Sequence, residues 1–446
     1  MQPNNLIINN SNNHISKWKF WPMMAVFYIL FVARNIFSLN FPVYIYLIWV
    51  AVMACIFNDT ETKALLISFI PLAPGFQGKY GILICMIALI VKNFKYLKMP
   101  YLVFIIPILM LWEILHMGLT NFSLAEYFSG FAPLMSLAVV VSLPNKREDI
   151  TFFIRVLATT CVVAFSILLV STVMLNGQSL MNLMQEGFRL GSVEVIDVAH
   201  KITYNANGLG YICNITIAGI LINIYFKSAK LADYLMLIFI VLIGCLTVSR
   251  TFLLCLLGTV VMYILIQNKS IHYKIRGFVI LAIILVVAFF TLKLIAPNII
   301  ENYLFRFGAD DVTGGRAKLY EFYNQFINSS AERFWYGIGV QNIDKKILEM
   351  VGVKMDVPHN GYQQAIVAWG VIGLILLLLL LLSLVLLAKK RNPNAPLICY
   401  LPLALLLVNI MAGQFITSGT KLISLVFIYL MIANGRKGSL GNKYGK

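Results

Sequence analysis

Charged side chains are scarce in this chain. Asp, Glu, Lys and Arg make up 12% of its 446 residues, whereas 60% of the residues are hydrophobic. Soluble domains carry about 25% charged residues, and no globular fold of this size has enough interior to hide so much apolar surface. Uninterrupted runs such as 278–293 and 373–388 have no polar face, and such runs are stable as helices in lipid. The composition therefore excludes a soluble protein and predicts an all-α, polytopic bundle of transmembrane helices.

Acidic residues are the scarcer kind of charge. The chain has 18 Asp and Glu against 35 Lys and Arg, which gives a formal net charge of +17. In a soluble protein this excess would suggest a nucleic-acid partner. Here many basic residues lie in short loops between apolar runs, as the positive-inside rule describes, and no nucleic-acid-binding motif is present. Nucleic acid is therefore not an expected partner, whereas membrane lipid is.

Cysteine is missing from every polar loop. All seven cysteines lie in apolar runs, which gives no support for a disulfide or a zinc site. The long loops also lack an obvious acidic cluster, so we expect neither a metal nor another cofactor. The Asn-rich start of the chain does not resemble a cleavable signal peptide, and the first helix, from about Trp21, is expected to direct insertion.

The apolar segments number fourteen. They lie near 21–38, 41–57, 62–76, 79–91, 101–118, 124–143, 150–175, 206–226, 231–247, 250–267, 276–296, 361–388, 397–412 and 415–433. A span needs about 20 residues, so the short segments 62–76 and 79–91 form either two thin spans or one re-entrant pair. We therefore expect about 12–14 spans.

Basic residues recur in alternate connections, which favours fourteen spans with both termini in the cytoplasm. The expected parts are a cytoplasmic tail (1–20), N-terminal spans (21–175), a first long outer loop (176–205), central spans (206–296), a large outer loop (297–360), C-terminal spans (361–433) and a cytoplasmic tail (434–446). The large outer loop carries Leu319, Phe322, Tyr323 and Phe326 at helix-like intervals. It is therefore predicted to form a packed helical cap on the outer side.

Four arginines lie on the predicted outer side, where the positive-inside rule does not explain them. They are Arg189, Arg250, Arg306 and Arg316. Each of them can simply pair with a nearby carboxylate, and Arg250 can also extend to the lipid interface. Several arginines that face one cavity would instead suit a diphosphate, because a guanidinium group binds phosphate oxygens in pairs.

His359 is the most informative single residue. It precedes Asn360, a favoured residue for capping a helix N-terminus, at the outer mouth of the long apolar segment 361–388. The field of a helix N-terminus disfavours imidazolium, so the neutral ring would be able to accept a proton. Elsewhere a lone histidine is more often structural. With the arginines, it suggests transfer of a group from a diphosphate to an alcohol, with at least one substrate tethered to lipid.

At these residues the chain resembles the superfamily of O-antigen ligases and O-antigen polymerases, which are bacterial membrane glycosyltransferases. The C-terminal signature of that superfamily is His-Asn, nine residues and Gly-x-x-Gly, which matches His359, Asn360, Gly370 and Gly373. Three further elements resemble it in order: Arg189-Leu190-x-Ser192 with Asn205, Asn207 and Gly208; Ser249-Arg250-Thr251 with Leu254; and Gly315-Arg316 with Tyr320, where another aromatic is commoner. The resemblance covers about 185–375.

The resemblance implies a GT-C-type fold and a glycan donor linked through diphosphate to undecaprenol. It implies metal-independent, inverting catalysis on the periplasmic face of the bacterial inner membrane, with His359 as general base and Arg189 and Arg316 on the diphosphate. Arg250 is a weaker candidate for binding substrate, and Asn360, His200 and Arg306 are candidates for support. Flippase and chain-length regulator proteins of the same pathway are implied partners.

We favour a polymerase of O-antigen or capsular type, which transfers the growing glycan to a hydroxyl of the next lipid-linked repeat unit. The close alternative is a ligase that transfers the glycan to a lipid A–core acceptor, since the signature is nearly the same. A flippase or transporter of lipid-linked oligosaccharide is a second alternative, although transporters often show internal repeats and broken helices, and no repeat is evident.

Two ionisable residues lie inside the predicted span 101–118, where charge is costly and often functional. Glu113 and His116 are three positions apart, so they would share one helix face. They are expected either to act in function or to satisfy each other inside the bundle.

Overall fold

The computed structural model describes residues 17–37, 39, 42–72, 78–116, 124–144, 148–191, 204–267, 269–308, 316–343 and 358–435. Throughout these ranges the fold is all α, with eighteen α-helices, three short 3₁₀ helices and no strand. His200, a predicted support residue of the site, falls outside the described residues. The protein is a polytopic helical membrane protein, as its composition predicts.

The helices follow the apolar segments closely. The first half of the chain forms α1 (Lys17–Asn35), α2 (Val43–Ile56), α3 (Asp59–Leu72), α4 (Gly78–Asn93), α5 (Leu102–His116), α6 (Leu124–Ser142), α7 (Ile150–Asn176), α8 (Leu180–Gln185) and α9 (Ala206–Tyr225). The second half forms α10 (Leu231–Leu246), α11 (Arg250–Ile266), α12 (Ile271–Ile295), α13 (Pro297–Gly308), α14 (Ala317–Asn328), α15 (Ala331–Tyr336), α17 (Gly361–Arg391), α18 (Leu401–Met411) and α19 (Gly419–Asn434). The 3₁₀ helices are η3 (Phe94–Tyr96), η6 (Val340–Asn342) and η7 (Leu397–Tyr400).

Four of the helices are long and apolar enough to cross a membrane, namely α7, α9, α12 and α17. Seven shorter apolar segments of 10–17 residues belong to α2, α5, α6, α10, α11, α18 with η7, and α19. The short segments 62–76 and 79–91 form two separate helices, α3 and α4, which pack against each other. Nearly all of α3 is buried, and it contacts α4, α7 and α19.

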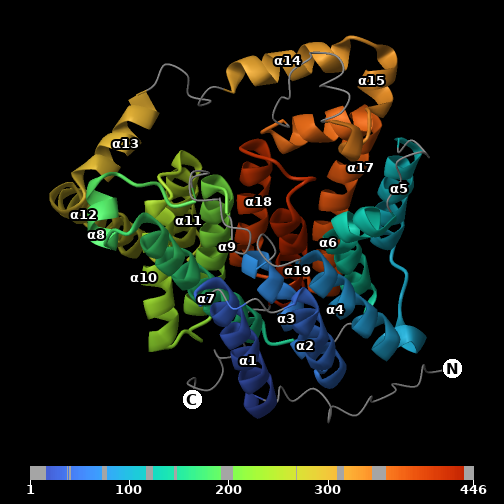
Figure 1. The fold of residues 1–446 in the computed structure, drawn as a ribbon, viewed down its shortest axis with the longest axis horizontal. Coiled ribbons are helices and arrows are strands. Elements are labelled where there is room, and N and C mark those ends of the chain that lie inside the picture. The colour runs from blue at the N-terminus through green and yellow to red at the C-terminus, as the bar shows by residue number, and fades with distance from the viewer. Residues whose placement is uncertain are drawn as a thin grey trace.

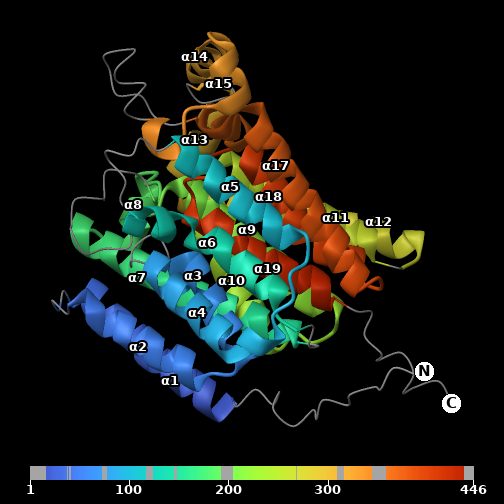
Figure 2. The same ribbon diagram turned by 90° about the vertical axis from the view of Figure 1, so that its right-hand side faces the viewer.

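The bundle has two distinct ends (Figure 1 and Figure 2). At one end, α14 and α15 lie across the tops of the longer helices, and α13 lies on the same side. We call this the loop end. The opposite end holds the predicted cytoplasmic connections: Arg391 at the end of α17 donates to Val141 O at 2.7 Å, and Lys63 pairs with Glu148 at 2.7 Å.

The large loop after α12 forms helices, as predicted. In α14, the residues Tyr323, Phe326 and Ile327 are buried, and α15 packs closely on α17. The spacing of aromatic residues in the sequence therefore marks the buried face of a cap helix. In contrast, α12 has no buried residue and packs mainly against α11 and α13, so it stands at the edge of the bundle.

Candidate active site

The turn between α10 and α11 has an unusual backbone. Val248 takes a positive φ of 46°, which a β-branched residue rarely adopts and which costs about 1–3 kcal/mol. Its side chain is buried with Ile299 and Tyr303 of α13. The phenol of Tyr303 donates to Cys245 O at 2.8 Å, one turn earlier. The side chains of α13 therefore hold this turn in its strained form.

Two arginines stabilise the same turn. Arg189 donates through Nε to Thr247 O at 2.9 Å, and Arg306 donates through Nη1 to Val248 O at 2.7 Å. The first residue of α11, Arg250, donates through Nη1 to Arg306 O at 2.5 Å. In this way the α10–α11 turn joins three arginines that are far apart in the sequence.

These three arginines have no acidic partner among the described residues. In the described part of the chain, no carboxylate pairs with Arg189, Arg250 or Arg306. Burial, together with the nearby positive charges of Arg306 and Arg316, lowers the pKa of Arg189 to about 10. Burial also lowers the pKa of Arg306, with contributions from Arg250 and Arg316. A guanidinium group with a pKa near 10 is still protonated at neutral pH, so the cluster concentrates positive charge that an anion would neutralise.

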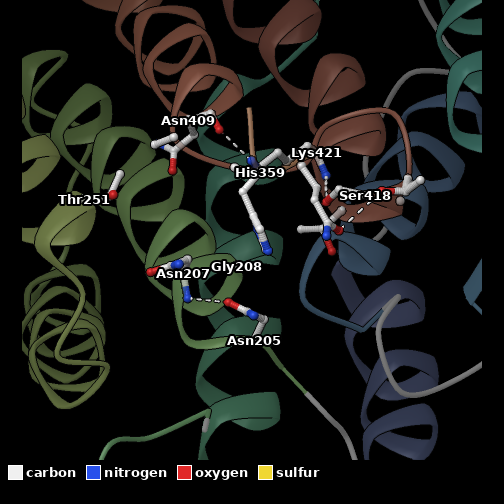
Figure 3. Close-up of a pocket in the computed structure, with 14 residues that line it drawn as sticks. Asn205, Asn207, Gly208, Thr251, His359, Asn409, Ser418 and Lys421 are labelled. Carbon is white, nitrogen blue, oxygen red and sulfur yellow. Dashed lines mark hydrogen bonds between the residues drawn. The ribbon is translucent and has the colours of Figure 1, made fainter. Parts of the chain in front are cut away.

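A cavity of about 420 Å³ opens at the loop end, beside this cluster (Figure 3). Its wall is formed by the first residues of α9, α11 and α19, the last turn of α18 with the residues after it, and His359. The lining residues are Asn205, Asn207, Gly208, Thr251, His359, Asn409, Ala412, Gly413, Gln414, Thr417, Ser418, Gly419, Thr420 and Lys421. The volume lies within the range of about 300–1,000 Å³ that small-molecule sites occupy.

Arg316 connects the arginine cluster to the cavity. It occupies the N-cap position of α14, and its Nη1 donates to Ala412 O at 3.4 Å. Ala412 belongs to the cavity wall. Arg316 also lies close enough to Arg189, Arg306 and Lys421 to repel each of them electrostatically. The side chain is thus near both the arginine cluster and Lys421.

Lys421 is the residue of this cavity that our sequence reasoning missed. It lies in the first turn of α19, is 6% exposed, and donates through Nζ to Asn409 O at 2.6 Å. Its ammonium group also lies 5.8 Å from the ring centroid of Tyr211. A signal was present, because the start of the segment 415–433 lies on the predicted outer side, where the positive-inside rule does not place a lysine.

The residues that follow His359 connect the start of α17 to α14 and to the α18–α19 connection. Asn360 is the N-cap of α17, as predicted, and its side chain accepts from Tyr362 N at 3.0 Å and from Gln363 N at 3.3 Å. The side chain of Gln363 donates to Tyr320 O of α14 at 2.9 Å.

The next residue, Gln364, is completely buried. It accepts from Phe415 N and Ile416 N, both at 2.9 Å, and donates to Thr417 Oγ1 at 2.9 Å. Because the α18–α19 connection forms part of the cavity wall, Gln364 holds that wall against the helix that begins beside His359.

The comparison with known families gives one match, over part of the chain. Residues 235–378 match the family described as O-antigen ligase. This match supports the resemblance to the O-antigen ligase and polymerase superfamily. The matched part is about a third of the chain. No curated protein matches the chain.

The O-antigen ligase segment runs from α10 into α17, so it contains Arg250, Arg306, Arg316 and His359. Arg189 precedes it, and the α18–α19 part of the cavity wall follows it. The structure brings Arg189, Arg250, Arg306 and Arg316 together, and it places Ala412, the partner of Arg316, in the same cavity wall as His359. No group of three or more His, Cys, Asp or Glu arranged to bind a metal occurs among the described residues.

The Gly-x-x-Gly part of the O-antigen ligase signature breaks α17. Gly370 has φ 67° and ψ −173°, so the helix is interrupted there, a feature that the uninterrupted apolar segment 361–388 did not predict. The carbonyls of Val367 and Ala368 accept from Ile338 N at 3.0 Å and Gly339 N at 2.7 Å, in the chain that follows α15. The break therefore docks the large loop onto the helix that begins beside His359.

Glu113 supports the same break from α5. Its carboxylate is buried and accepts from Val340 N at 2.9 Å and from Trp369 Nε1 at 2.7 Å. The ring of His116 instead contacts its own helix, with Nδ1 2.7 Å from Trp112 O. Glu113 thus connects three elements at the break, which is a different role from the local pairing with His116 that the sequence left open.

Proposed function

We propose that this protein is a glycosyltransferase that takes a glycan from undecaprenyl diphosphate and transfers it to a hydroxyl group. One observation carries the proposal: Arg189, Arg250 and Arg306 have no carboxylate partner in the described part of the chain, and with Arg316 they adjoin a cavity lined by His359. Guanidinium groups bind phosphate oxygens in pairs, so the cluster suits a diphosphate. The histidine suits deprotonation of an alcohol.

In the proposed reaction, His359 accepts the proton of the acceptor hydroxyl while the hydroxyl oxygen forms a bond to the anomeric carbon of the donor. The bond between that carbon and the phosphate oxygen breaks, and its electron pair leaves with the diphosphate. Arg189 and Arg316 stabilise the negative charge on the leaving group, and Arg250 and Arg306 hold the strained turn beside it. Attack from the face opposite the diphosphate inverts the anomeric centre.

We favour a polymerase, in which the acceptor is the next lipid-linked repeat unit. The alternative is a ligase that uses a lipid A–core acceptor, and the description of the matched family, O-antigen ligase, favours it. In either case we propose that the loop end faces the periplasm from a bacterial inner membrane and that both termini lie in the cytoplasm. A GT-C-type fold and cooperation with flippase and chain-length regulator proteins belong to the same proposal.

A transporter would use the break in α17 differently. Broken helices of transporters offer freed carbonyls to an ion or substrate. Here the carbonyls of Val367, Ala368 and Trp369 accept hydrogen bonds from Ile338 N, Gly339 N and Trp112 Nε1. Because protein donors already occupy these carbonyls, the break favours a docking role over transport.

The test uses the full chain in lipid nanodiscs with purified lipid-linked repeat units. Longer glycans would identify a polymerase, transfer to an added lipid A–core acceptor would identify a ligase, and the absence of any covalent product would support a transporter. His359→Ala should abolish product formation while leaving thermal stability unchanged. The matched control is His272→Ala, because His272 is exposed at the start of α12 and lies outside the site. Product formation by His359→Ala at the rate of that control would refute the proposed base.

A further inference from the structure

We propose that the cavity beside His359 contains a phosphate subsite whose cation is Lys421, a residue outside the motifs and outside the matched family segment. The ligand class is a diphosphate, and the identification of this diphosphate as the leaving group of the donor rests on the proposed function. Lys421 would bind the phosphate oxygens from inside the bundle, opposite the arginines of the α10–α11 turn.

The chemistry of the cavity wall favours an anion. Among the described residues the wall contains no Asp or Glu, and the only ionisable side chains there are His359 and Lys421. Its other polar side chains are amides and hydroxyls, which can donate hydrogen bonds to phosphate oxygens: Asn205, Asn207, Thr251, Asn409, Gln414, Thr417, Ser418 and Thr420. A site for a cationic ligand would need carboxylates, and the described residues of this wall supply none.

Helix termini add to the positive potential. Three helices of 16–20 residues, α9, α11 and α19, begin at the cavity wall. The first amides of a helix have no intrahelical acceptor and carry the positive end of its dipole, and this favours phosphate. The N-cap side chains of Asn205, Ser249 and Ser418 accept from one such amide each, at Asn207 N, Phe252 N and Lys421 N, so further amides of each first turn are left for a ligand.

The burial of Lys421 needs an explanation that its protein contacts do not provide. Nζ donates to one carbonyl, that of Asn409 in the last turn of α18, and no carboxylate pairs with it among the described residues. The attraction between one ammonium group and one helix terminus is weak compared with the cost of burying that charge. The neighbouring charge of Arg316 increases this cost. An anion bound between Lys421 and Arg316 would offset this cost of burial.

Lys421 also has room to bind. An ammonium group has three donors, and Asn409 O uses one of them. Gly413 faces the group, and a Cβ at that position would lie 3.2 Å from Nζ, so the absence of a side chain keeps the space beside the ammonium open. The close-up shows Lys421 near His359 in the same cavity (Figure 3). A diphosphate bound here would therefore lie beside the proposed base.

The test measures binding of inorganic pyrophosphate to the full chain in nanodiscs, by calorimetry, together with thermal stability without ligand. We expect Lys421→Met to weaken pyrophosphate binding at least about tenfold, which corresponds to about 1.4 kcal/mol. The same variant should unfold at the same or a higher temperature than wild type, because it removes a buried charge and keeps a long side chain. The control is Lys318→Met, which removes the same charge from an exposed position on α14 and should bind as wild type does.

Three outcomes would overturn the subsite: wild type that does not bind pyrophosphate, Lys421→Met that binds it as tightly as Lys318→Met, or Lys421→Met that unfolds at a lower temperature. The last of these would show that the lysine mainly caps α18. Failure of the proposed function is distinguishable, because wild type would then bind pyrophosphate through Lys421 and yet form no glycan product. Conversely, glycan transfer that survives Lys421→Met would preserve the function and remove the subsite.

Discussion

Replacing Gly370 with alanine tests whether the break in α17 is required. Gly370 has φ 67° and ψ −173°, a backbone conformation that is essentially restricted to glycine, and another residue pays about 1–3 kcal/mol to adopt it. A Cβ at this position would also overlap the backbone of Trp335 and Tyr336 at the end of α15. Because these are backbone atoms, the contact cannot be relieved by a change of side-chain rotamer, and the chain that follows α15 must move.

That movement has a further cost. It would remove the hydrogen bonds from Ile338 N to Val367 O and from Gly339 N to Ala368 O, which contribute about 0.5–1.5 kcal/mol each. When the cost of the strained backbone conformation is added, Gly370→Ala should lower the free energy of unfolding by about 2–6 kcal/mol. Since the segment before the break begins beside His359, we also expect the variant to lose glycan transfer.

The assay compares thermal unfolding in nanodiscs with that of a matched variant, Gly258→Ala. Gly258 lies inside α11, and a Cβ there would meet no atom within 4 Å. Alanine in a helix interior is about 0.8–1.0 kcal/mol more favourable than glycine, so this control should be neutral or more stable. If Gly370→Ala unfolded at the same temperature as Gly258→Ala, the break would not be held as described, and its role in positioning the site would be refuted.

Three further predictions concern the contacts around the site. Arg316→Ala should weaken pyrophosphate binding and slow turnover, since it removes a cation between the cluster and Lys421; calorimetry and product formation measure both effects. Glu113→Leu should leave Val340 N without its acceptor and make the loop after α15 more sensitive to protease, whereas Glu113→Gln should have a milder effect. Gln364→Leu should leave two buried amides of the α18–α19 connection unpaired, at about 1–3 kcal/mol each, and should lower both the unfolding temperature and the affinity for pyrophosphate.

Most of the helices were predictable because the signal for a membrane helix is local. A run of apolar residues between polar loops specifies a helix whatever it packs against, and each of the fourteen predicted segments corresponds to a helix in the structure. The start of α17 was predictable for the same reason, because the capping residue Asn360 lies next to the helix in the sequence. The number of helices that cross the membrane stays a prediction.

The break at Gly370 depends on partners that are distant in the sequence. An apolar stretch that contains glycine forms a continuous helix unless other groups satisfy the carbonyls that a break exposes, and here the donors come from the loop after α15 and from α5. The position of Lys421 was hidden for a similar reason. Its burial depends on α18 and α9, which are brought against α19 only by the tertiary fold.

The matched family segment cannot form the proposed site alone. Residues 235–378 supply the arginines after α10 and the histidine before α17, but most of the wall of the adjoining cavity comes from α9, α18 and α19. Those three helices contribute amides, hydroxyls and one buried lysine rather than a motif that sequence patterns identify. In the proposed site the motif residues therefore supply the base and partly buried cations, while the surrounding bundle supplies a cavity whose described lining contains no carboxylate and in which those charges would act on a diphosphate.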